Sequence, residues 1–125
     1  KFKAEPKLEF ERLTDIRQKV KITLVLHGAS GVPSWIVEKA TKYGAELGGA
    51  RGIPDEHIKK AISLGIAKIN IDTDLRLAFT ATIREVLANS PKEFDPRKIL
   101  GPTKEAMKEV VKGKMRLFGS SGKAL

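Results

Sequence analysis

Two short segments carry the residues best suited to chemistry, "HGASG" at residues 27–31 and "NIDTD" at residues 70–74. His27 has the side chain of a metal ligand or a general base, although a lone histidine before a turn can also be purely structural. Gly28 and Gly31 let backbone N–H groups approach an anion closely, and Ser30 adds a hydroxyl. The second segment offers an amide, a hydroxyl and two carboxylates. These groups suit a ligand that carries both phosphate and hydroxyl groups.

The two carboxylates within residues 70–74 argue against simple side-chain contact with a phosphate. We expect the Asn70 amide, the Thr73 hydroxyl and backbone N–H groups to bind the phosphate instead. Asp72 is then free to accept a hydrogen bond from a sugar hydroxyl, and Asp74 to cap the following helix. The second histidine, His57, lies early in a predicted helix among charged residues. We expect its side chain to be exposed on the surface.

Each segment coincides with the end of a short run of β-branched and aliphatic residues, which predicts a buried strand. The strands are expected at 21–28 and 67–72. Apolar spacing and helix-start or helix-stop residues predict helices at 10–18, at 35–43 after a Ser34 cap, at 55–64 before Gly65, at 75–89 after a Thr73 or Asp74 cap, and at 103–118, with a short turn at 95–96. This order is typical of βα units in a parallel sheet.

Two of the predicted helices carry long apolar stripes, which we expect to face the core. The stripe residues are Leu75, Ala78, Phe79, Ile83, Val86 and Leu87 in the first helix, and Met107, Val110, Val111, Met115 and Phe118 in the second.

Alternation of side chains across a strand sorts both predicted strands in the same way. One face of each is apolar, which suits covering helices. The other becomes polar toward the C-terminal end, at His27 in the first strand and at Asn70 and Asp72 in the second. A barrel interior fits that pattern, because (β/α)8 barrels carry their working residues at the C-terminal ends of the strands. Two strands alone leave faces and edges uncovered, so the chain is expected to need more sheet from elsewhere.

The chain is basic, with 24 Lys and Arg against 15 Asp and Glu among 125 residues and a formal net charge of +9. The excess is densest after Arg97 and suits polyanions, phosphorylated metabolites as well as nucleic acid. Trp35, Tyr43 and most phenylalanines fall at helical core spacing, so no stacking surface for nucleic acid is expected. The absence of cysteine excludes disulfides, thiolate metal sites and thiol nucleophiles. Metal ligands must therefore come from His27, His57 or carboxylates.

No apolar run reaches the ~18 residues of a membrane span. The opening "KFKAEPKLEFERL" begins with Lys1 and lacks the apolar stretch of a signal peptide. We therefore expect a cytoplasmic protein without membrane contact, and a chain that begins inside a longer one.

These motifs, in this order, resemble the class II, zinc-dependent fructose-1,6-bisphosphate aldolases. The resemblance rests on "LVLHGASGVP", "IKKAISLGIAKINIDTDLRLAFTATIREVL", "FDPRKILGP" and "AMKEVVKGKMRLFGSSGKA", and it covers essentially all 125 residues. It implies a (β/α)8 TIM barrel that reversibly cleaves fructose 1,6-bisphosphate to dihydroxyacetone phosphate and glyceraldehyde 3-phosphate, in glycolysis and gluconeogenesis. Residues 43–54, "YGAELGGARGIP", resemble an extra loop found in some members.

By this resemblance, His27 is a ligand of the catalytic zinc. Gly28 and Ser30 belong to the loop that binds the phosphate of dihydroxyacetone phosphate and offers carbonyls to a monovalent cation, Na+ or K+. Asn70 and Asp72 are the implied catalytic residues, and the Asn70 amide would hydrogen-bond the oxyanion that zinc stabilises. Arg76 lies where some members contact the other phosphate. The implied substrate-binding set is Gly28, Ala29, Ser30, Asn70, Ile71, Asp72, Thr73 and Arg76.

The family places three histidine ligands on zinc, and this chain offers only His27 for that role. A catalytic zinc takes about three protein ligands. We therefore expect residues 1–125 to be the C-terminal part of one TIM-barrel domain, holding its last two βα units and terminal helices. The other ligands and the acid/base aspartate are expected in the missing N-terminal part, on the same or a separate chain. This chain alone is expected to be inactive, and the resemblance implies a homodimer or homotetramer.

Two alternative functions stay open. Tagatose-bisphosphate aldolase shares the machinery and differs in the stereochemistry of its sugar, which "NIDTDLR" does not discriminate. A non-catalytic module would instead bind polyanions through the basic C-terminal helix, with an affinity that falls steeply with salt.

Overall fold

The computed structural model describes residues 7–124, which form an α/β arrangement of five helices and two parallel strands. The elements are α1 (Phe10–Lys19), β1 (Leu24–Leu26), α2 (Ser34–Lys42), α3 (Asp55–Ser63), β2 (Ile66–Ile69), α4 (Thr73–Asn89) and α5 (Pro96–Leu117). The predicted order of helices and strands is confirmed. None of the helices in this part of the chain combines the length and apolar character needed to cross a bilayer.

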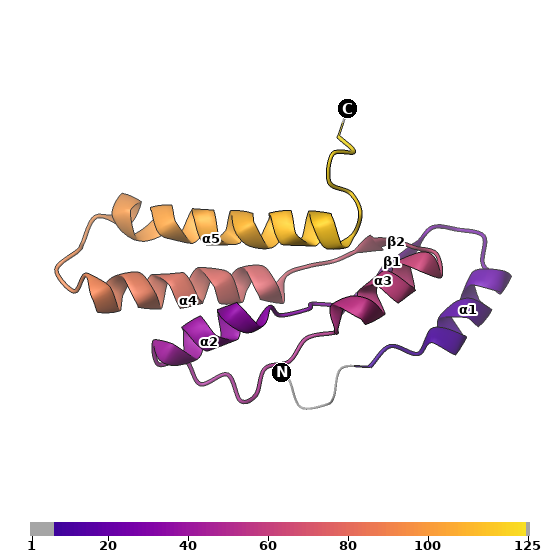
Figure 1. The fold of residues 1–125 in the computed structure, drawn as a ribbon, viewed down its shortest axis with the longest axis horizontal. Coiled ribbons are helices and arrows are strands. Elements are labelled where there is room, and N and C mark those ends of the chain that lie inside the picture. The colour runs from indigo at the N-terminus through magenta and orange to yellow at the C-terminus, as the bar shows by residue number, and fades with distance from the viewer. Residues whose placement is uncertain (1–6, 125) are drawn as a thin grey trace.

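The elements form an elongated molecule with two ends (Figure 1). At one end α4 and α5 lie side by side and antiparallel, with α2 packed against α4. At the other end the two short strands lie against α3, and α1 is outermost. The loops that follow β1 and β2 run between the two ends, so they are held by both.

The two strands pair in parallel, as the sequence predicts. Leu24 lies opposite Ile66 and Leu26 opposite Ile69, with an irregularity after Leu24. Both strands are shorter than predicted, and β2 begins one residue earlier. The predicted polar residues at the strand ends, including His27 and Asn70, therefore lie just beyond the strands and not within them.

Two apolar clusters hold the elements together. The first joins α2, α4 and α5 through Ile36, Ala40, Ala45, Ala78, Ala81 and Val110. The second lies under the strands, where Leu26 and Ile69 pack against Ala29, Ile53 and Ile58. The predicted apolar strand faces are therefore confirmed only in part: Leu26 and Ile69 pack toward the helices, but Ile22 is 72% exposed and Ala67 is exposed. On the opposite face, Val25 is 42% exposed.

The apolar stripes of α4 and α5 are only partly buried. Ala78 and Val110 are covered, but Phe79, Leu87 and Met115 are between 38% and 48% exposed. The prediction that all stripe residues face the core is therefore wrong for residues 7–124. Each helix buries the narrow strip that faces its neighbour, and no other described segment covers the rest.

The caps predicted for two helices are also wrong. Helix α2 begins at Ser34 itself, after Pro33, and α4 begins at Thr73, after Asp72; neither start has a side-chain cap. Asp74 lies inside the first turn of α4 and has partners elsewhere. By contrast, Gly65 has the left-handed φ of +102° that the sequence predicts after α3.

Helix α5 begins seven residues earlier than predicted, because residues 95–97 form a strong helix start. Asp95 is the N-cap and accepts a hydrogen bond from the Arg97 N–H at 2.9 Å, and Pro96 occupies the first turn. The Arg97 guanidinium also lies 2.7 Å from Asp95 Oδ2. The short turn predicted at 95–96 is thus the first turn of a long helix that accommodates Pro102.

This helix start predicts a specific acid sensitivity. Hydrogen bonds from the Arg97 side chain, and then from its backbone N–H, hold the pKa of Asp95 below its usual 3.8. Since the folded state favours the charged form, the stabilisation is complete above pH ~4 and is lost as the pH falls through the lowered pKa. Asp95→Asn in the full-length protein should therefore be less stable than the wild type at neutral pH. Urea unfolding at pH 3 to 7 should show this gap closing on acidification, and a gap that stays constant would contradict it.

Candidate functional site

His27 and Asn70 meet in space, although they lie 43 residues apart in sequence. The Asn70 Nδ2 atom lies 3.1 Å from Nδ1 and 3.0 Å from Nε2 of the imidazole. The amide nitrogen is thus almost equally distant from both ring nitrogens. The parallel pairing of β1 and β2 brings both residues to the same end of the sheet, and the Asn70 N–H donates to the Leu26 carbonyl at 3.1 Å.

His27 could serve as one ligand of a metal ion. Its side chain is exposed, so an ion could approach the ring. Within residues 7–124, however, no three His, Cys, Asp or Glu side chains are close enough to hold an ion together. The described residues therefore fit one position of a zinc site, and the remaining ligands must come from elsewhere.

The loop after β1 presents free backbone donors. Within the described chain, the N–H groups of residues 28–31 donate to no protein acceptor. Gly28 has a φ of +67°, which glycine adopts without strain, and no described atom lies near its missing Cβ. Ala29 is 1% exposed as a whole residue and packs in the core, so its side chain and its backbone are both covered in this structure.

The first turn of α4 presents a second set of free donors. No side chain caps this helix, and the N–H groups of residues 73–75 have no acceptor within the described chain. A helix N-terminus favours anions, because the peptide dipoles leave partial positive charge there. The two donor sets are tied together, since the Val32 N–H at the end of the loop donates to Asp74 Oδ1 at 3.1 Å. Unpaired N–H groups at a glycine-rich loop and at a helix start are the type of donor that binds phosphate groups in proteins.

Two other predicted residues pair with each other. Arg76 Nε donates to Asp72 Oδ1 at 3.0 Å, one helical turn apart, and both side chains are largely exposed. An exposed pair of this kind contributes little stability, so either group can exchange its partner for a ligand. Thr73 is half-buried, and Ile71 lines a small apolar groove beside α5, which leaves its backbone for contact with a ligand.

His57 does not have the exposed position predicted for it. Its ring is half-buried and stands edge-on to Phe10 of α1, with ring centroids 5.3 Å apart. Its Nδ1 is buried without a hydrogen-bond partner within the described chain. The prediction was wrong because α1 folds back over this part of α3, which helix periodicity cannot show.

Sequence reasoning missed Lys114, which the structure buries. Its side chain is 11% exposed and its ammonium lies 2.7 Å from Asp74 Oδ2. In sequence Lys114 is one of many lysines in a basic helix, so no local signal separates it from the exposed ones. One feature of the sequence indicates that Lys114 could be buried. It lies four residues after Val110, and residues at that spacing share one face of a helix.

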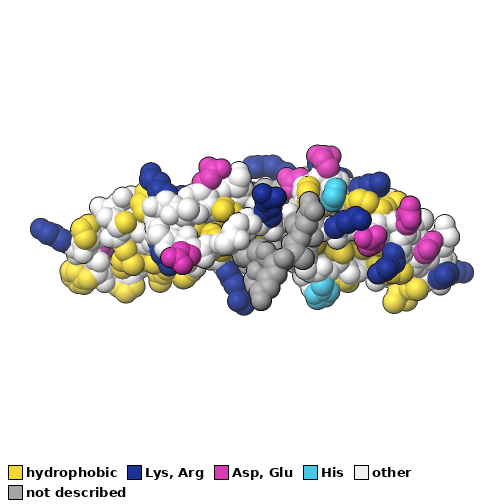
Figure 2. All heavy atoms as spheres, turned by 90° about the horizontal axis from the view of Figure 1, so that it is seen from below, with side chains coloured by type: hydrophobic (Ala, Val, Ile, Leu, Met, Phe, Trp, Pro, Cys, Tyr) yellow, Lys and Arg dark blue, Asp and Glu magenta, His cyan; other side chains and the backbone are white. Residues whose placement is uncertain are grey.

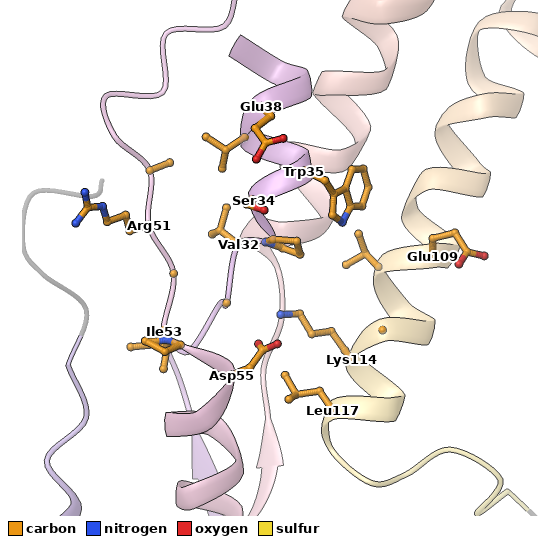
Figure 3. A pocket seen from close by; sticks show the side chains of 18 residues that line it. Val32, Ser34, Trp35, Glu38, Arg51, Ile53, Asp55, Glu109, Lys114 and Leu117 are labelled. Carbon is orange, nitrogen blue, oxygen red and sulfur yellow. The ribbon is translucent and has the colours of Figure 1, made fainter. Parts of the chain in front are cut away.

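A cavity of about 710 Å³ lies between α2, residues 50–55 and α5 (Figure 3). It is lined by Gly31, Val32 and Lys114 among others, but not by His27 or Asn70. The cavity therefore lies behind the loop after β1, and the residues predicted to do chemistry do not face it.

Basic side chains do not gather into one patch on the face seen in Figure 2. Lys and Arg alternate there with Asp and Glu. Along α5, Lys108 pairs with Glu105 and Lys112 with Glu109, so part of the basic excess is neutralised locally.

Comparison with known proteins gives a consistent result. A family model described as fructose-bisphosphate aldolase class-II matches residues 1–46 and 47–123. A protein of Thermus caldophilus named fructose-bisphosphate aldolase is 61% identical over 124 residues, which are 99% of this chain and 41% of that protein. Proteins of the same name from Helicobacter pylori strain J99 and Geobacillus stearothermophilus are each 46% identical over 123 residues, 98% of this chain. They are covered over 40% and 36% of their own lengths, so this chain spans well under half of these relatives.

Proposed function

This chain belongs to the class II fructose-bisphosphate aldolase family, and on that premise we propose the function of the whole protein. The protein reversibly cleaves fructose 1,6-bisphosphate to dihydroxyacetone phosphate and glyceraldehyde 3-phosphate in the cytoplasm. Residues 1–125 are the C-terminal part of one (β/α)8 barrel domain, and β1 and β2 are its last two strands. The remaining strands would cover the exposed strand face that includes Val25. The assembled protein is a homodimer or homotetramer.

One observation carries the proposal: two sets of free N–H donors, from residues 28–31 and 73–75, are joined by the Val32–Asp74 hydrogen bond. We assign the phosphate of dihydroxyacetone phosphate to these donors, with the Ser30 and Thr73 hydroxyls beside them. Carbonyls of the same loop would bind a monovalent cation, Na+ or K+, which offsets the phosphate charge. The substrate would thus be held by backbone more than by basic side chains.

The reacting end of the substrate would lie at His27 and Asn70. His27 is one zinc ligand, and the others come from outside this chain. When bound, zinc supplies the Lewis acidity that polarises the substrate ketone. The Asn70 amide donates to the oxygen on which negative charge develops as the carbon–carbon bond breaks, and so it stabilises the transition state more than the ground state. Asp72 accepts from a sugar hydroxyl, and Arg76 exchanges Asp72 for the second phosphate.

The proposal is tested by assaying the full-length, zinc-loaded protein on fructose 1,6-bisphosphate and tagatose 1,6-bisphosphate in parallel. We expect the fructose compound to be cleaved with a kcat/KM at least about tenfold higher, and no cleavage of either after chelation of the metal. A preference for the tagatose compound would support the same catalytic residues and reaction, with tagatose 1,6-bisphosphate as the substrate. No cleavage of either by the zinc-loaded protein would refute the proposal. Residues 1–125 alone should be inactive, because they provide one zinc ligand.

A further inference from the structure

We propose that Asp74 and Lys114 are positioning residues that fix the loop after β1 in its anion-binding shape. The Asp74 backbone N–H belongs to the donor set at residues 73–75, but neither the Asp74 nor the Lys114 side chain is assigned to the substrate. The inference rests on the proposed function, because it concerns the loop to which the substrate phosphate was assigned. It adds that α5, at the end of the chain, determines how well that loop binds.

Asp74 joins three segments that are remote in sequence. Its carboxylate is fully buried, at 0% exposure, in the first turn of α4. Oδ1 accepts from the Val32 N–H at 3.1 Å, and Oδ2 lies 2.7 Å from Lys114 Nζ. The ammonium approaches Oδ2 off the usual hydrogen-bond direction, so this contact is a close ion pair. One carboxylate thus holds the loop on one side and α5 on the other.

Lys114 also contacts the loop directly. Figure 3 shows its side chain extending from α5 toward Val32 and Asp55. A Cβ placed on Gly31 would lie 2.9 Å from Lys114 Nζ and 3.2 Å from the Ile53 carbonyl. The Lys114 ammonium therefore packs against the backbone of the loop at Gly31. A shift of Lys114 would leave a gap beside the loop at this residue.

Stability alone explains this pair poorly. Two buried charges lose their hydration, and replacing such a pair by apolar side chains of similar size often leaves a protein as stable or more so. An apolar pair, however, could not accept the hydrogen bond from Val32. The Asp74–Lys114 pair therefore has a role that apolar side chains could not fill. It fixes the Val32 N–H, which is next to residues 28–31.

The position of Lys114 explains how a carboxylate can lie beside the proposed phosphate site. A negative group beside a phosphate site would repel the phosphate unless its charge is balanced. Lys114 supplies that balance from the side of the cavity behind the loop. Asp74 can therefore organise the loop without opposing the anion that the loop binds.

The test compares full-length, zinc-loaded variants by calorimetric titration with dihydroxyacetone phosphate and by kinetics. Lys114→Met should weaken dihydroxyacetone phosphate binding at least about tenfold and raise KM by a similar factor, with zinc content unchanged. Lys114→Arg should restore most of the affinity, because it restores the positive charge. The matched control is Lys39→Met, which removes the 2.6 Å ion pair between Lys39 of α2 and Glu85 of α4. It should leave affinity for the ligand unchanged.

A second variant covers the case in which an unpaired Asp74 prevents folding. Asp74→Leu/Lys114→Met removes both charges together, and it should fold, bind zinc and still bind dihydroxyacetone phosphate at least about tenfold more weakly. Wild-type affinity in this folded double variant would overturn the inference. A wild-type protein that binds no dihydroxyacetone phosphate at all would instead overturn the proposed function, and this inference with it.

Discussion

His27→Ala in the full-length protein is expected to remove bound zinc and to lower the rate of bisphosphate cleavage by at least about a thousandfold. His27 is exposed at the end of β1, with its ring edge against Asn70, and it is the one metal ligand that we assign to this chain. Loss of a Lewis acid removes several kcal/mol of transition-state stabilisation, and each ~1.4 kcal/mol is a factor of ten in rate. Zinc content by mass spectrometry and steady-state kinetics measure the two effects.

The matched control for this experiment is His57→Ala, the other histidine of the chain. Its ring packs on Phe10 and lies in no proposed site, so the variant should keep both zinc and activity while losing some stability. A His27→Ala protein that retains stoichiometric zinc would show that His27 is structural, which is the alternative that the sequence by itself leaves open.

Gly52→Ala is expected to have the second large effect, because residues 50–55 cross the loop after β1 with backbone against backbone. A Cβ on Gly52 would lie 2.5 Å from both the Ser30 carbonyl oxygen and the Val32 nitrogen, and closer still to the carbonyl carbon of Gly31. These are backbone atoms, so they cannot rotate away as a flexible side chain would. The neighbouring Ile53 N–H, which donates to the Ser30 carbonyl at 3.0 Å, would be displaced as well.

Overpacking of this kind costs about 1–3 kcal/mol of unfolding free energy. Since the loop itself must move, we also expect KM for the bisphosphate to rise at least about tenfold. Urea unfolding and kinetics of the full-length variant measure the two. Gly113→Ala is the control: no described atom lies near its missing Cβ, and alanine within a helix should stabilise by about 0.5–1 kcal/mol. Unchanged stability and KM in Gly52→Ala would contradict the prediction, because they would show that the backbone at Gly52 and the loop after β1 can separate at little cost.

The sequence predicted the architecture well because its signals were periodic. The apolar runs before residues 28 and 70, and the helices around them, depend on local patterns that survive in the structure. Parallel pairing followed from the same patterns, and it accounts for the meeting of His27 and Asn70. The strand ends were less predictable, because a strand ends where its pairing with the neighbouring strand ends. That point depends on both strands and not on the sequence of one.

Buried charges were predicted poorly because their partners are distant in sequence. Asp74 has the type and position of a cap, yet its partners are Val32 and Lys114. Ser34 and Thr73 were each displaced by a single position, since both are the first residue of their helix and not the residue before it.

The uncapped start of α4 would link folding to the phosphate binding that we propose. A helix start with three free N–H groups is less stable than a capped one, and the empty protein bears that deficit. A phosphate bound there would act as the cap, so by mass action the folded state gains stability in proportion to how fully the site is occupied. Phosphate-bound copies of the full-length protein would then unfold less often than copies without phosphate.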